Sequence, residues 1–502
     1  MINSTIGQRP LLRLELSLLM DHSGVPNVRF WPIMIAIFFG AFLSILGIST
    51  INVALSIFMQ DFHASLSTVQ WTLTGFMLSL GTVAPLTGYL GNRFGYKNVY
   101  LYAMVGFVIF SLLCGFSWGI GSLITFRIIQ GIFTGLVLPA TMTIIFQVIP
   151  KERQPFAVSI WGLSAMLAPA FGPTISGWLI QQFSWRWLFF INVPIGLIAI
   201  VFIVAMIPNY RIGKSTGLDK IGLATVVLSS VSLLVALSQG RQWGWDSGKT
   251  VGLFVFGAVM LILFIWRELR TDNPLLDLRV FGNYRFSVTL LANTIITISL
   301  YSGTLLVPLF LQNVQQITPM DTGLILLPSS LIMALSMPLA GKIYPRFGAK
   351  WLTVGGLVLI IWGSYEMTHM HNDTSHLYII FWMAVRNLGV SFAAAATSTA
   401  GMEEIQPQMV GHASSVTNWI RNVGGSFAIA LFTSLLASHT ITHVTELTTA
   451  GTETANLIPL FGFTMSVNDV FMVATYIAVA ALPFTFLIRK QARRTQPAAV
   501  AA

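Results

Sequence analysis

Charged side chains inside long apolar runs are the residues of this sequence that could do chemistry. Arg127 and Arg386 each lie within such a run, and Arg421 lies within a third, beside Asn418 and Asn422. A guanidinium keeps its proton at cellular pH, so in an apolar site it must find an anion or several carbonyl acceptors. No acidic residue is expected at the depth of these arginines. Two interpretations stay open: the arginines bind a ligand, or they hold helices together through carbonyl groups.

Glu366 is the acidic residue expected deepest in an apolar run. It lies ~22 Å from the start of its run, at 1.5 Å per helical residue. Its carboxylate could carry a proton, and His369 could pass that proton on. Neighbouring aromatic residues such as Trp362 favour the alternative, a hydrated carboxylate in the aromatic belt at the membrane surface. Asp321 and Asp469 each begin an apolar run, so we expect both to be helix N-caps.

Other kinds of chemical site find little support. A metal site is conceivable in one expected outer loop, but nothing fixes its geometry, and a hydrated polar loop accounts for its residues. These residues are His369, His371, Asp373 and His376. No phosphate-binding loop, nucleophile elbow or paired-carboxylate site occurs, so we expect no enzyme, no cofactor and no resident metal. The single cysteine, Cys114, excludes an intramolecular disulfide.

The residues above are embedded in a composition typical of a membrane protein. The chain has 502 residues, of which 55% are hydrophobic and only 9% are charged, and its mean hydropathy is +0.77. Soluble domains carry about 25% charged residues. Fourteen apolar runs are long enough to cross a bilayer core of about 30 Å as helices of about 20 residues. They lie near 31–59, 69–90, 98–118, 121–149, 156–180, 187–207, 220–238, 250–266, 286–312, 321–343, 351–370, 377–399, 410–437 and 467–488.

The distribution of basic residues predicts the orientation of these runs. Of the 27 Lys and Arg, 21 fall in segments that are cytoplasmic if the N-terminus is inside, three fall outside, and three lie within runs. This is the positive-inside pattern, with both termini cytoplasmic. It also accounts for the formal net charge of +10 without a nucleic-acid partner.

Two basic loops repeat one pattern 253 residues apart. The first loop's Pro85, Leu86, Gly88, Arg93, Phe94, Gly95 and Lys97 match Pro338, Leu339, Gly341, Arg346, Phe347, Gly348 and Lys350. Small residues allow two helix ends to approach, and basic side chains can engage helix C-terminal carbonyls. We therefore expect the loops to latch one conformation, the alternative being that they only anchor the chain at the inner surface. A duplicated apolar bundle is the architecture of a transporter.

The repeat predicts the organisation of the chain. We expect a cytoplasmic segment over 1–30, a six-helix bundle over 31–207, a linker with two inserted transmembrane helices over 208–285, a second six-helix bundle over 286–488, and a cytoplasmic tail over 489–502. The apolar residues of the linker near 275–281 predict a surface helix along the inner face. An outer loop is expected over 438–466.

At this point the sequence resembles a known family. The segment from Gly88 to Lys97 resembles the loop signature of the major facilitator superfamily, and Arg127 to Gly131 resembles its Arg-x-x-Gln-Gly motif, with Gln130 as the Gln. Residues of the run at 156–180 resemble the signature of its proton-coupled exporters, namely Gly162, Pro169, Gly172, Pro173 and Gly177. The segment 185–196 is close to a hallmark of its fourteen-span drug:proton antiporters. The resemblance covers nearly all of the chain.

Two positions depart from the family pattern. Asn92 stands where the loop signature has Asp, which weakens the charge-dependent part of the latch. In the first run, Ser49 to Ala54 resembles a family element, but Gly47 occupies the position of its membrane-embedded Asp. The usual proton-carrying carboxylate is therefore absent from this run, so proton coupling is implied by the resemblance alone.

The Pro and Gly residues of the run at 156–180 have a physical interpretation that does not depend on the family resemblance. Pro169 and Pro173 remove backbone donors and bend a helix, while Gly172 and Gly177 offer a small face for close packing. Such a helix suits two bundles that rock against one another. The alternative is an ordinary kinked packing helix, since Pro and Gly are common in membrane helices.

These expectations combine into one reading with alternatives. The resemblance implies the major facilitator fold, here fourteen helices as two six-helix bundles plus two inserted helices, and a proton-coupled exporter of amphipathic compounds in a bacterial cytoplasmic membrane. A central cavity would be lined by Asn52, Arg127, Gln130, Arg386, Asn418 and Arg421, with Arg127 and Glu366 as the proton-coupling candidates. The expected partners are a small amphipathic molecule, protons and the lipid bilayer, with a periplasmic adaptor protein left open. The alternatives are an exporter of anionic amphiphiles such as fatty acids, and a non-transporting scaffold or sensor.

Overall fold

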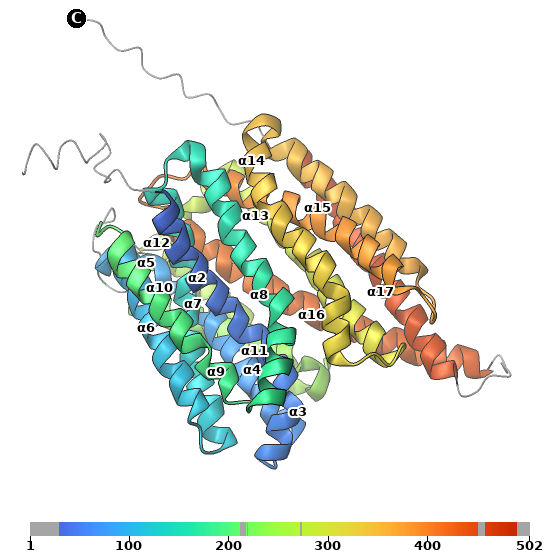
Figure 1. Ribbon diagram of the computed structural model, residues 1–502. Helices are drawn as coiled ribbons and strands as arrows, with labels where there is room; N and C mark the ends of the chain where they lie inside the picture. The colour runs from blue at the N-terminus through green and yellow to red at the C-terminus, as the bar shows by residue number, and fades with distance from the viewer. Residues whose placement is uncertain (1–29, 211–216, 218, 272–273, 450–456, 489–502) are drawn as a thin grey trace, which may run out of the picture.

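All regular structure in the described part of the chain is helical. The computed structural model describes residues 30–210, 217, 219–271, 274–449 and 457–488, and Figure 1 shows their arrangement. The N-terminal half comprises α2 (Phe30–Ser49), α3 (Ile51–Asp61), α4 (Leu66–Val83), α5 (Leu86–Phe94), α6 (Tyr96–Gly115), α7 (Ile120–Val148), α8 (Gln154–Gln182), α9 (Trp187–Phe190) and α10 (Asn192–Met206). The linker holds α11 (Lys220–Trp243) and α12 (Gly248–Arg270). The C-terminal half comprises α13 (Tyr284–Asn313), α14 (Pro319–Glu366), α15 (His376–Met402), α16 (Val410–Thr449) and α17 (Ile458–Phe486).

The helices have the length and apolar character that a membrane requires. Among the described residues, 11 helices could span a bilayer, or up to 12 if the pair α4 and α5, bent by 58°, forms one span. An all-helical membrane fold is therefore confirmed. The total of fourteen spans stays a prediction.

Three local predictions were wrong: the helix N-caps at Asp321 and Asp469, the outer loop at 438–466 and the surface helix of the linker. Thr318 caps α14 and accepts a hydrogen bond from the Asp321 N–H (3.2 Å), and Asp469 lies inside α17, whose cap residue is Leu457. The expected outer loop at 438–466 is largely helical, because α16 continues to Thr449 and α17 begins at Ile458. Of the expected surface helix, only a short 3₁₀ turn forms over Leu278–Gly282, since neighbouring linker residues such as Leu276 are buried in the core.

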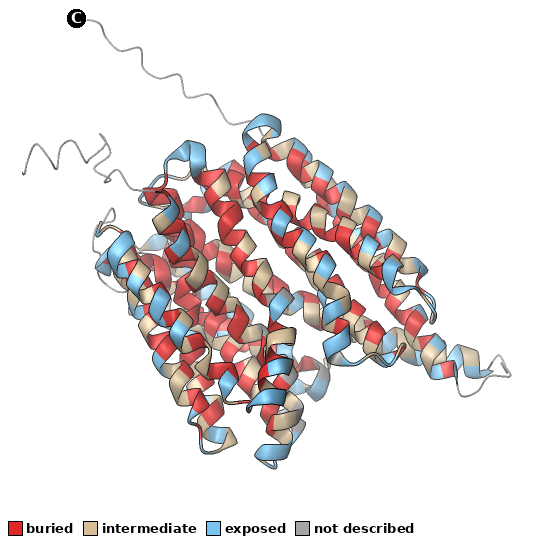
Figure 2. Ribbon diagram, in the orientation of Figure 1, coloured by how far each residue is buried: buried red, intermediate tan, exposed pale blue. Residues whose placement is uncertain are grey.

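The two halves share their largest hydrophobic core at one end. Figure 1 shows the N-terminal half (blue to green) beside the C-terminal half (yellow to red). The largest core cluster mixes both halves, because Met34 and Phe146 belong to the same cluster as Met402 and Val416. Two other clusters stay within one half, one around Phe58 and one around Phe432 and further residues of the C-terminal half. Figure 2 shows the buried residues on the helix faces that meet one another.

The repeated loops lie at the end where the halves share their core. Gly88 contacts His412 near the start of α16, and Gly341 contacts Phe156 near the start of α8. The end of α7 belongs to the same region, since Gln147 Nε2 donates to the Pro407 carbonyl (2.8 Å). We call this the loop end, and the opposite end the far end. Both loops therefore lie on one face of the molecule, as a parallel repeat requires.

The inserted helices pack unequally. α11 contacts both α4 and α16, and Trp419 Nε1 of α16 donates to Ser230 Oγ of α11 (2.8 Å). α12 packs mainly on α11 and is otherwise largely exposed, as a lipid-facing helix would be. α11 thus lies along the seam between the halves.

Two repeat-related glycines make the turns of the basic loops. Gly95 ends α5 at φ +86°, and Gly348 interrupts α14 at φ +74°. L-residues with a side chain rarely adopt these positive φ values. The repeated Arg-Phe-Gly sequence therefore has a backbone reason, which is that only glycine closes this turn without strain.

We predict that Gly348→Ala destabilises the protein by about 1–3 kcal/mol, the usual cost of a strained backbone. A Cβ on Gly348 would meet no atom within 4 Å, so the loss would come from φ and not from a clash. Gly355→Ala is the matched control, because Gly355 also has open space but lies in regular helix, where alanine is favourable. Thermal unfolding of the purified variants measures both effects, and equal melting temperatures for the two would contradict the prediction.

Candidate functional site

The first basic loop docks on α16 of the other half. The Gly88 N–H donates to Ser415 Oγ (3.1 Å) in a buried position. A Cβ on Gly88 would lie only 3.1 Å from His412 Nδ1. Tyr96 Oη donates to the Gly88 carbonyl (3.3 Å). The glycine therefore permits a close helix-to-helix approach that a larger residue would disturb.

The second basic loop makes the corresponding contact with α8. A Cβ on Gly341 would lie 2.6 Å from the Pro155 carbonyl oxygen and 2.3 Å from Ser159 Oγ. Lys342 Nζ lies over the Phe156 ring, 5.7 Å from its centroid. Each half therefore places a glycine of its loop against a helix of the other half.

Neutral contacts surround Asn92, where the family signature has Asp. Asn92 Nδ2 lies 3.1 Å from His412 Nε2, and His412 Nδ1 accepts a hydrogen bond from the Asp277 N–H (3.3 Å). His412 is buried. A side-chain amide, an imidazole and a backbone N–H thus join α5, the linker and α16 without any carboxylate.

The basic side chains of the loops differ in their partners. Lys97 Nζ donates to the Val204 carbonyl (2.8 Å) in the last turn of α10, which is the kind of contact that the sequence predicted. Arg93 Nη1 donates to Tyr89 Oη (2.5 Å). In the second loop, Arg346 lies over the Phe347 ring, and Lys350 lies over the Phe486 ring.

Arg127 of α7 joins α2 and α4 through buried hydrogen bonds. Its side chain is 1% exposed, and its guanidinium donates to the Thr72 carbonyl (3.1 Å), Gln130 Oε1 (2.8 Å) and the Gly47 carbonyl (2.9 Å). It also stacks on Phe76, 4.0 Å from the ring centroid. Carbonyl groups thus satisfy the cation, as one of the two interpretations predicted, and Arg127 with Gln130 faces the interior of its own half.

Arg386 has the same role in the C-terminal half. It is fully buried and donates to Ser364 Oγ (3.1 Å), to Ser302 Oγ (3.0 Å) and to the Ser299 carbonyl. These bonds join α13, α14 and α15. Its Nη1 has no hydrogen-bond partner among the described residues and lies 2.5 Å from where a Cβ on Gly303 would be. No carboxylate of the described chain pairs with Arg127 or Arg386.

Arg421 lies in a different environment, between the halves. It is only partly buried, and its guanidinium lies over the Trp161 ring of α8, 5.5 Å from the centroid. Its Nη2 donates to Asn418 Oδ1 (2.6 Å), and Asn418 in turn donates to the Ser414 carbonyl (2.9 Å). Of the three arginines, Arg421 alone contacts the opposite half through a side chain.

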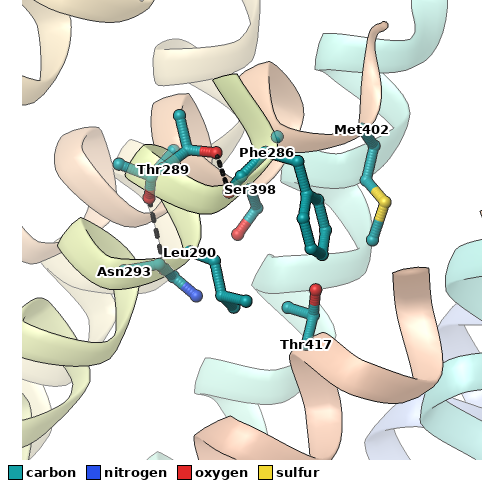
Figure 3. A pocket seen from close by; sticks show the side chains of 9 residues that line it. Phe286, Thr289, Leu290, Asn293, Ser398, Met402 and Thr417 are labelled. Carbon is teal, nitrogen blue, oxygen red and sulfur yellow. Dashed lines mark hydrogen bonds between the residues drawn. The ribbon is translucent and has the colours of Figure 1, made fainter. Parts of the chain in front are cut away.

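The predicted cavity residues therefore do not form one lining in this conformation. Arg127 and Gln130 lie inside one half, Arg386 lies inside the other, and Asn418 and Arg421 lie between them. The side chain of Asn52 lies outside the described residues. A cavity of about 10 Å³ between α13, α15 and α16 (Figure 3) has room for about one water and none for an amphipathic molecule. In Figure 3, the Phe286 ring and the Thr417 hydroxyl point toward each other.

Of the exporter-like residues of α8, Gly162 lies at the contact of this helix with α14. A Cβ on Gly162 would lie 2.7 Å from Met337 Cε, whereas one on Gly177 would meet nothing within 4 Å. Gly172 is buried, and its carbonyl accepts a hydrogen bond from Ser176 Oγ (2.6 Å). The side chains of Pro169 and Pro173 lie outside the described residues. α8 is thus a helix of the interface between the halves.

Glu366 ends α14 at the far end. Trp362 Nε1 donates to Glu366 Oε1 (3.3 Å), and Tyr378 Oη donates to the Glu366 backbone carbonyl (2.8 Å). The helix ends at this residue, and its neighbour Tyr365 is exposed. This position agrees with the interfacial alternative, while a role in proton coupling stays a prediction.

The fold and contacts above can now be compared with known proteins. The profile of the Major Facilitator Superfamily matches residues 37–429. The chain belongs to the major facilitator superfamily. This family and this fold are those of a transporter and not of an enzyme.

Individual relatives place the chain within this superfamily. It is 33% identical to YhcA of Bacillus subtilis, an uncharacterized transporter of the major facilitator type, over 83% of this chain and 78% of that protein. It is 27% identical to LmrB of Listeria monocytogenes, a lincomycin resistance protein, over 94% of this chain and 99% of that protein. Further relatives at 28–29% identity are named as multidrug resistance or multidrug transporter proteins. The crystal structure of the human organic anion transporter MFSD10 is similar in fold, with a TM-score of 0.58 and 13% identity over 89% of this chain and 99% of that one.

The sequence did not predict two groups of buried charged residues in this major facilitator protein. Arg285 at the start of α13 is buried and bonds to Glu403 (2.6 Å) and Glu404 (3.0 Å); burial raises the pKa of Glu403, although the Arg285 charge opposes the rise. Glu268 in α12 is only 2% exposed and accepts a hydrogen bond from the Leu276 N–H (3.1 Å). Glu268 is therefore more buried than Glu366, which is partly exposed. The Arg285 pairing links residues more than 100 positions apart, so spacing alone offered no signal.

We predict that a carboxylate at position 47 would be tolerated because Arg127 would neutralise it. A Cβ on Gly47 would lie 3.9 Å from Arg127 Nη1, which is close enough for an added carboxylate to form an ion pair. Ala41→Asp is the matched control in the same helix, since Ala41 is equally buried and an unpaired acid there costs about 3 kcal/mol. Thermal unfolding should show a much smaller loss for Gly47→Asp. Equal losses for the two variants would rule out the pairing.

Proposed function

We propose that the chain is a fourteen-span, proton-coupled exporter of amphipathic compounds, of the drug:proton antiporter type, in a bacterial cytoplasmic membrane. The 12 candidate spans, with α8 and the second stretch of α14 added, support a total of fourteen. The basic residues of the two loops support cytoplasmic termini. The division at 31–207, 208–285 and 286–488 into two bundles and an inserted pair belongs to the same proposal.

One observation carries the transport mechanism. Both repeated loops dock on the opposite half at the loop end, whereas the core clusters around Phe58 and Phe432 each stay within one half. A molecule closed at one end and separately packed at the other is what alternating access requires of an outward-facing state. The alternative class, a scaffold or sensor, has no need of two matched glycine contacts between the halves.

The relatives favour drug-like substrates, whereas Arg421 favours substrates that are anionic. LmrB is named as a lincomycin resistance protein, and other relatives are named as multidrug resistance or multidrug transporter proteins, which favours broad export. Arg127 and Arg386 bond only to groups of their own half, so an anion preference rests on Arg421, the one of these three arginines that lies between the halves. Export of anionic amphiphiles such as fatty acids is thus the second candidate.

Arg127 and Glu366 remain the candidate residues for proton coupling. With glycine at position 47, the carbonyl of that residue, and not a carboxylate, contacts Arg127. A periplasmic adaptor protein remains an open part of the proposal.

Transport in sealed vesicles tests the function. Purified protein in liposomes should move several amphipathic compounds, and faster with an imposed pH gradient than without one. Gly341→Leu should lower the rate at least about tenfold, because its side chain meets the Pro155 backbone at the loop end and disfavours closure by more than 1.4 kcal/mol. Gly355→Leu, on the same helix with open space, is the control that should transport normally. A protein that moves no compound with or without a gradient would support the scaffold instead.

Charge selectivity separates the two substrate classes. We predict that Arg421→Gln weakens transport of a fatty-acid-like anion more than that of a lipophilic cation of similar size, because it removes the positive charge between the halves. Arg386→Gln should instead lower thermal stability by about 1–3 kcal/mol, the cost of leaving buried acceptors unpaired, and affect both substrates alike. Competition assays on both variants measure these effects. Equal losses of anion and cation transport in Arg421→Gln would leave broad export without its anionic refinement.

A further inference from the structure

Three metal-ligating side chains meet between α16 and α17 toward the far end. His439 Nδ1 lies 2.8 Å from Asp469 Oδ2, and His443 Nε2 lies 2.7 Å from the same oxygen. The three ligand atoms all lie within 4.8 Å of one another. The hydrogen bonds and ring contacts of these three side chains in the described chain stay within the α16–α17 pair.

The backbone presents these groups together. His439 and His443 are four residues apart on α16, so both side chains lie on one helix face. Asp469 faces them from α17. A Cβ on Gly462 would lie 2.6 Å from Val444 Cγ2, which shows that the two helices approach closely just beyond the cluster.

α17 is also anchored beside the carboxylate. Asn468 Nδ2, next to Asp469 in sequence, donates to the Met370 carbonyl (2.9 Å). Thr464 Oγ1 donates to Asn372 Oδ1 (2.6 Å) one turn earlier. These bonds fix α17 against the segment that follows α14, so Asp469 is held in position.

A second carboxylate stands behind one histidine. His443 Nδ1, the ring nitrogen that faces away from Asp469, lies 3.4 Å from Glu446 Oε2. This nitrogen has no hydrogen-bond partner among the described residues. A metal-bound histidine usually has a carboxylate or carbonyl at its other nitrogen, which orients the ring. Glu446 is placed for that purpose.

We propose that His439, His443 and Asp469 form a binding site for a divalent transition-metal ion of the zinc class. Two imidazoles and one carboxylate are a known three-ligand set for Zn²⁺, with water in the fourth position. Bonds of about 2.0–2.1 Å place tetrahedral ligands about 3.4 Å apart, so each histidine nitrogen, now 2.8 Å and 2.7 Å from Asp469 Oδ2, needs to move outward by about 0.6–0.7 Å. The Asp469 side chain is 42% exposed, which leaves a path for the ion and for a water ligand.

The site lies apart from the proposed transport path. Arg421 and Trp161 mark the contact between the halves, whereas the cluster joins two helices of one half. A bound ion would cross-link α16 to α17. It would stabilise this helix pair by a free energy that rises with the logarithm of the ion's concentration divided by its Kd.

Metal binding by the full-length, tag-free protein tests the site. After treatment with a chelator, calorimetric titration with Zn²⁺ should reveal one site, and Zn²⁺ should raise the melting temperature. Co²⁺ should give the visible absorption of a four-coordinate ion. His443→Gln and Asp469→Asn should each weaken Zn²⁺ binding at least about tenfold, and both should abolish the thermal shift.

The control variant removes a histidine elsewhere on the same face. His371→Gln, in the segment after α14, should bind Zn²⁺ as the unmodified protein does. If His443→Gln fails to fold by circular dichroism, His439→Gln reports on the same site. The proposal is overturned if the unmodified protein shows no saturable Zn²⁺ binding, which would leave an ion pair only, or if either site variant binds within about twofold of it.

Discussion

A guanidinium that cannot lose its proton must be satisfied inside the membrane, and this constraint organises each half of the molecule. Arg127 bonds to the Gly47 carbonyl of α2, and Arg386 lies 3.5 Å from the Leu300 carbonyl of α13. Gly47 and Leu300 are 253 residues apart, the same interval as the repeated loops. In each half, therefore, one arginine ties a later helix to the first helix.

The proposed transport requires an interface between the halves that can open. At the loop end, Gly88 and Gly341 remove the side chains that would keep α5 from α16 and α14 from α8. Asn92 keeps the polar contacts neutral, because it meets His412 without a carboxylate. The departure from the family loop pattern thus makes the contact of this one residue depend on a hydrogen bond instead of on a carboxylate charge.

The sequence predicted those features that depend on local order. The repeat, the helical membrane fold and the bond of Lys97 to a helix-end carbonyl follow from residue type and spacing. Features that depend on distant partners were missed: Arg285 meets Glu403 only after folding. The four-residue spacing of His439 and His443 is a usable signal, but the loop expected over 438–466 hides their common helix face.

The energy of the closure at the loop end decides whether a transporter can use it. The polar bonds there are few and neutral: Gly88 to Ser415, Asn92 to His412, Gln147 to Pro407 and Ser414 to Pro139. At about 0.5–1.5 kcal/mol each, they sum to a few kcal/mol. A ligand needs about 5.5 kcal/mol of differential affinity to invert a 1:99 equilibrium. The polar bonds of the loop end are therefore comparable in total to the differential affinity that the proposed export needs, and the apolar core shared by the halves adds to the energy of this closure.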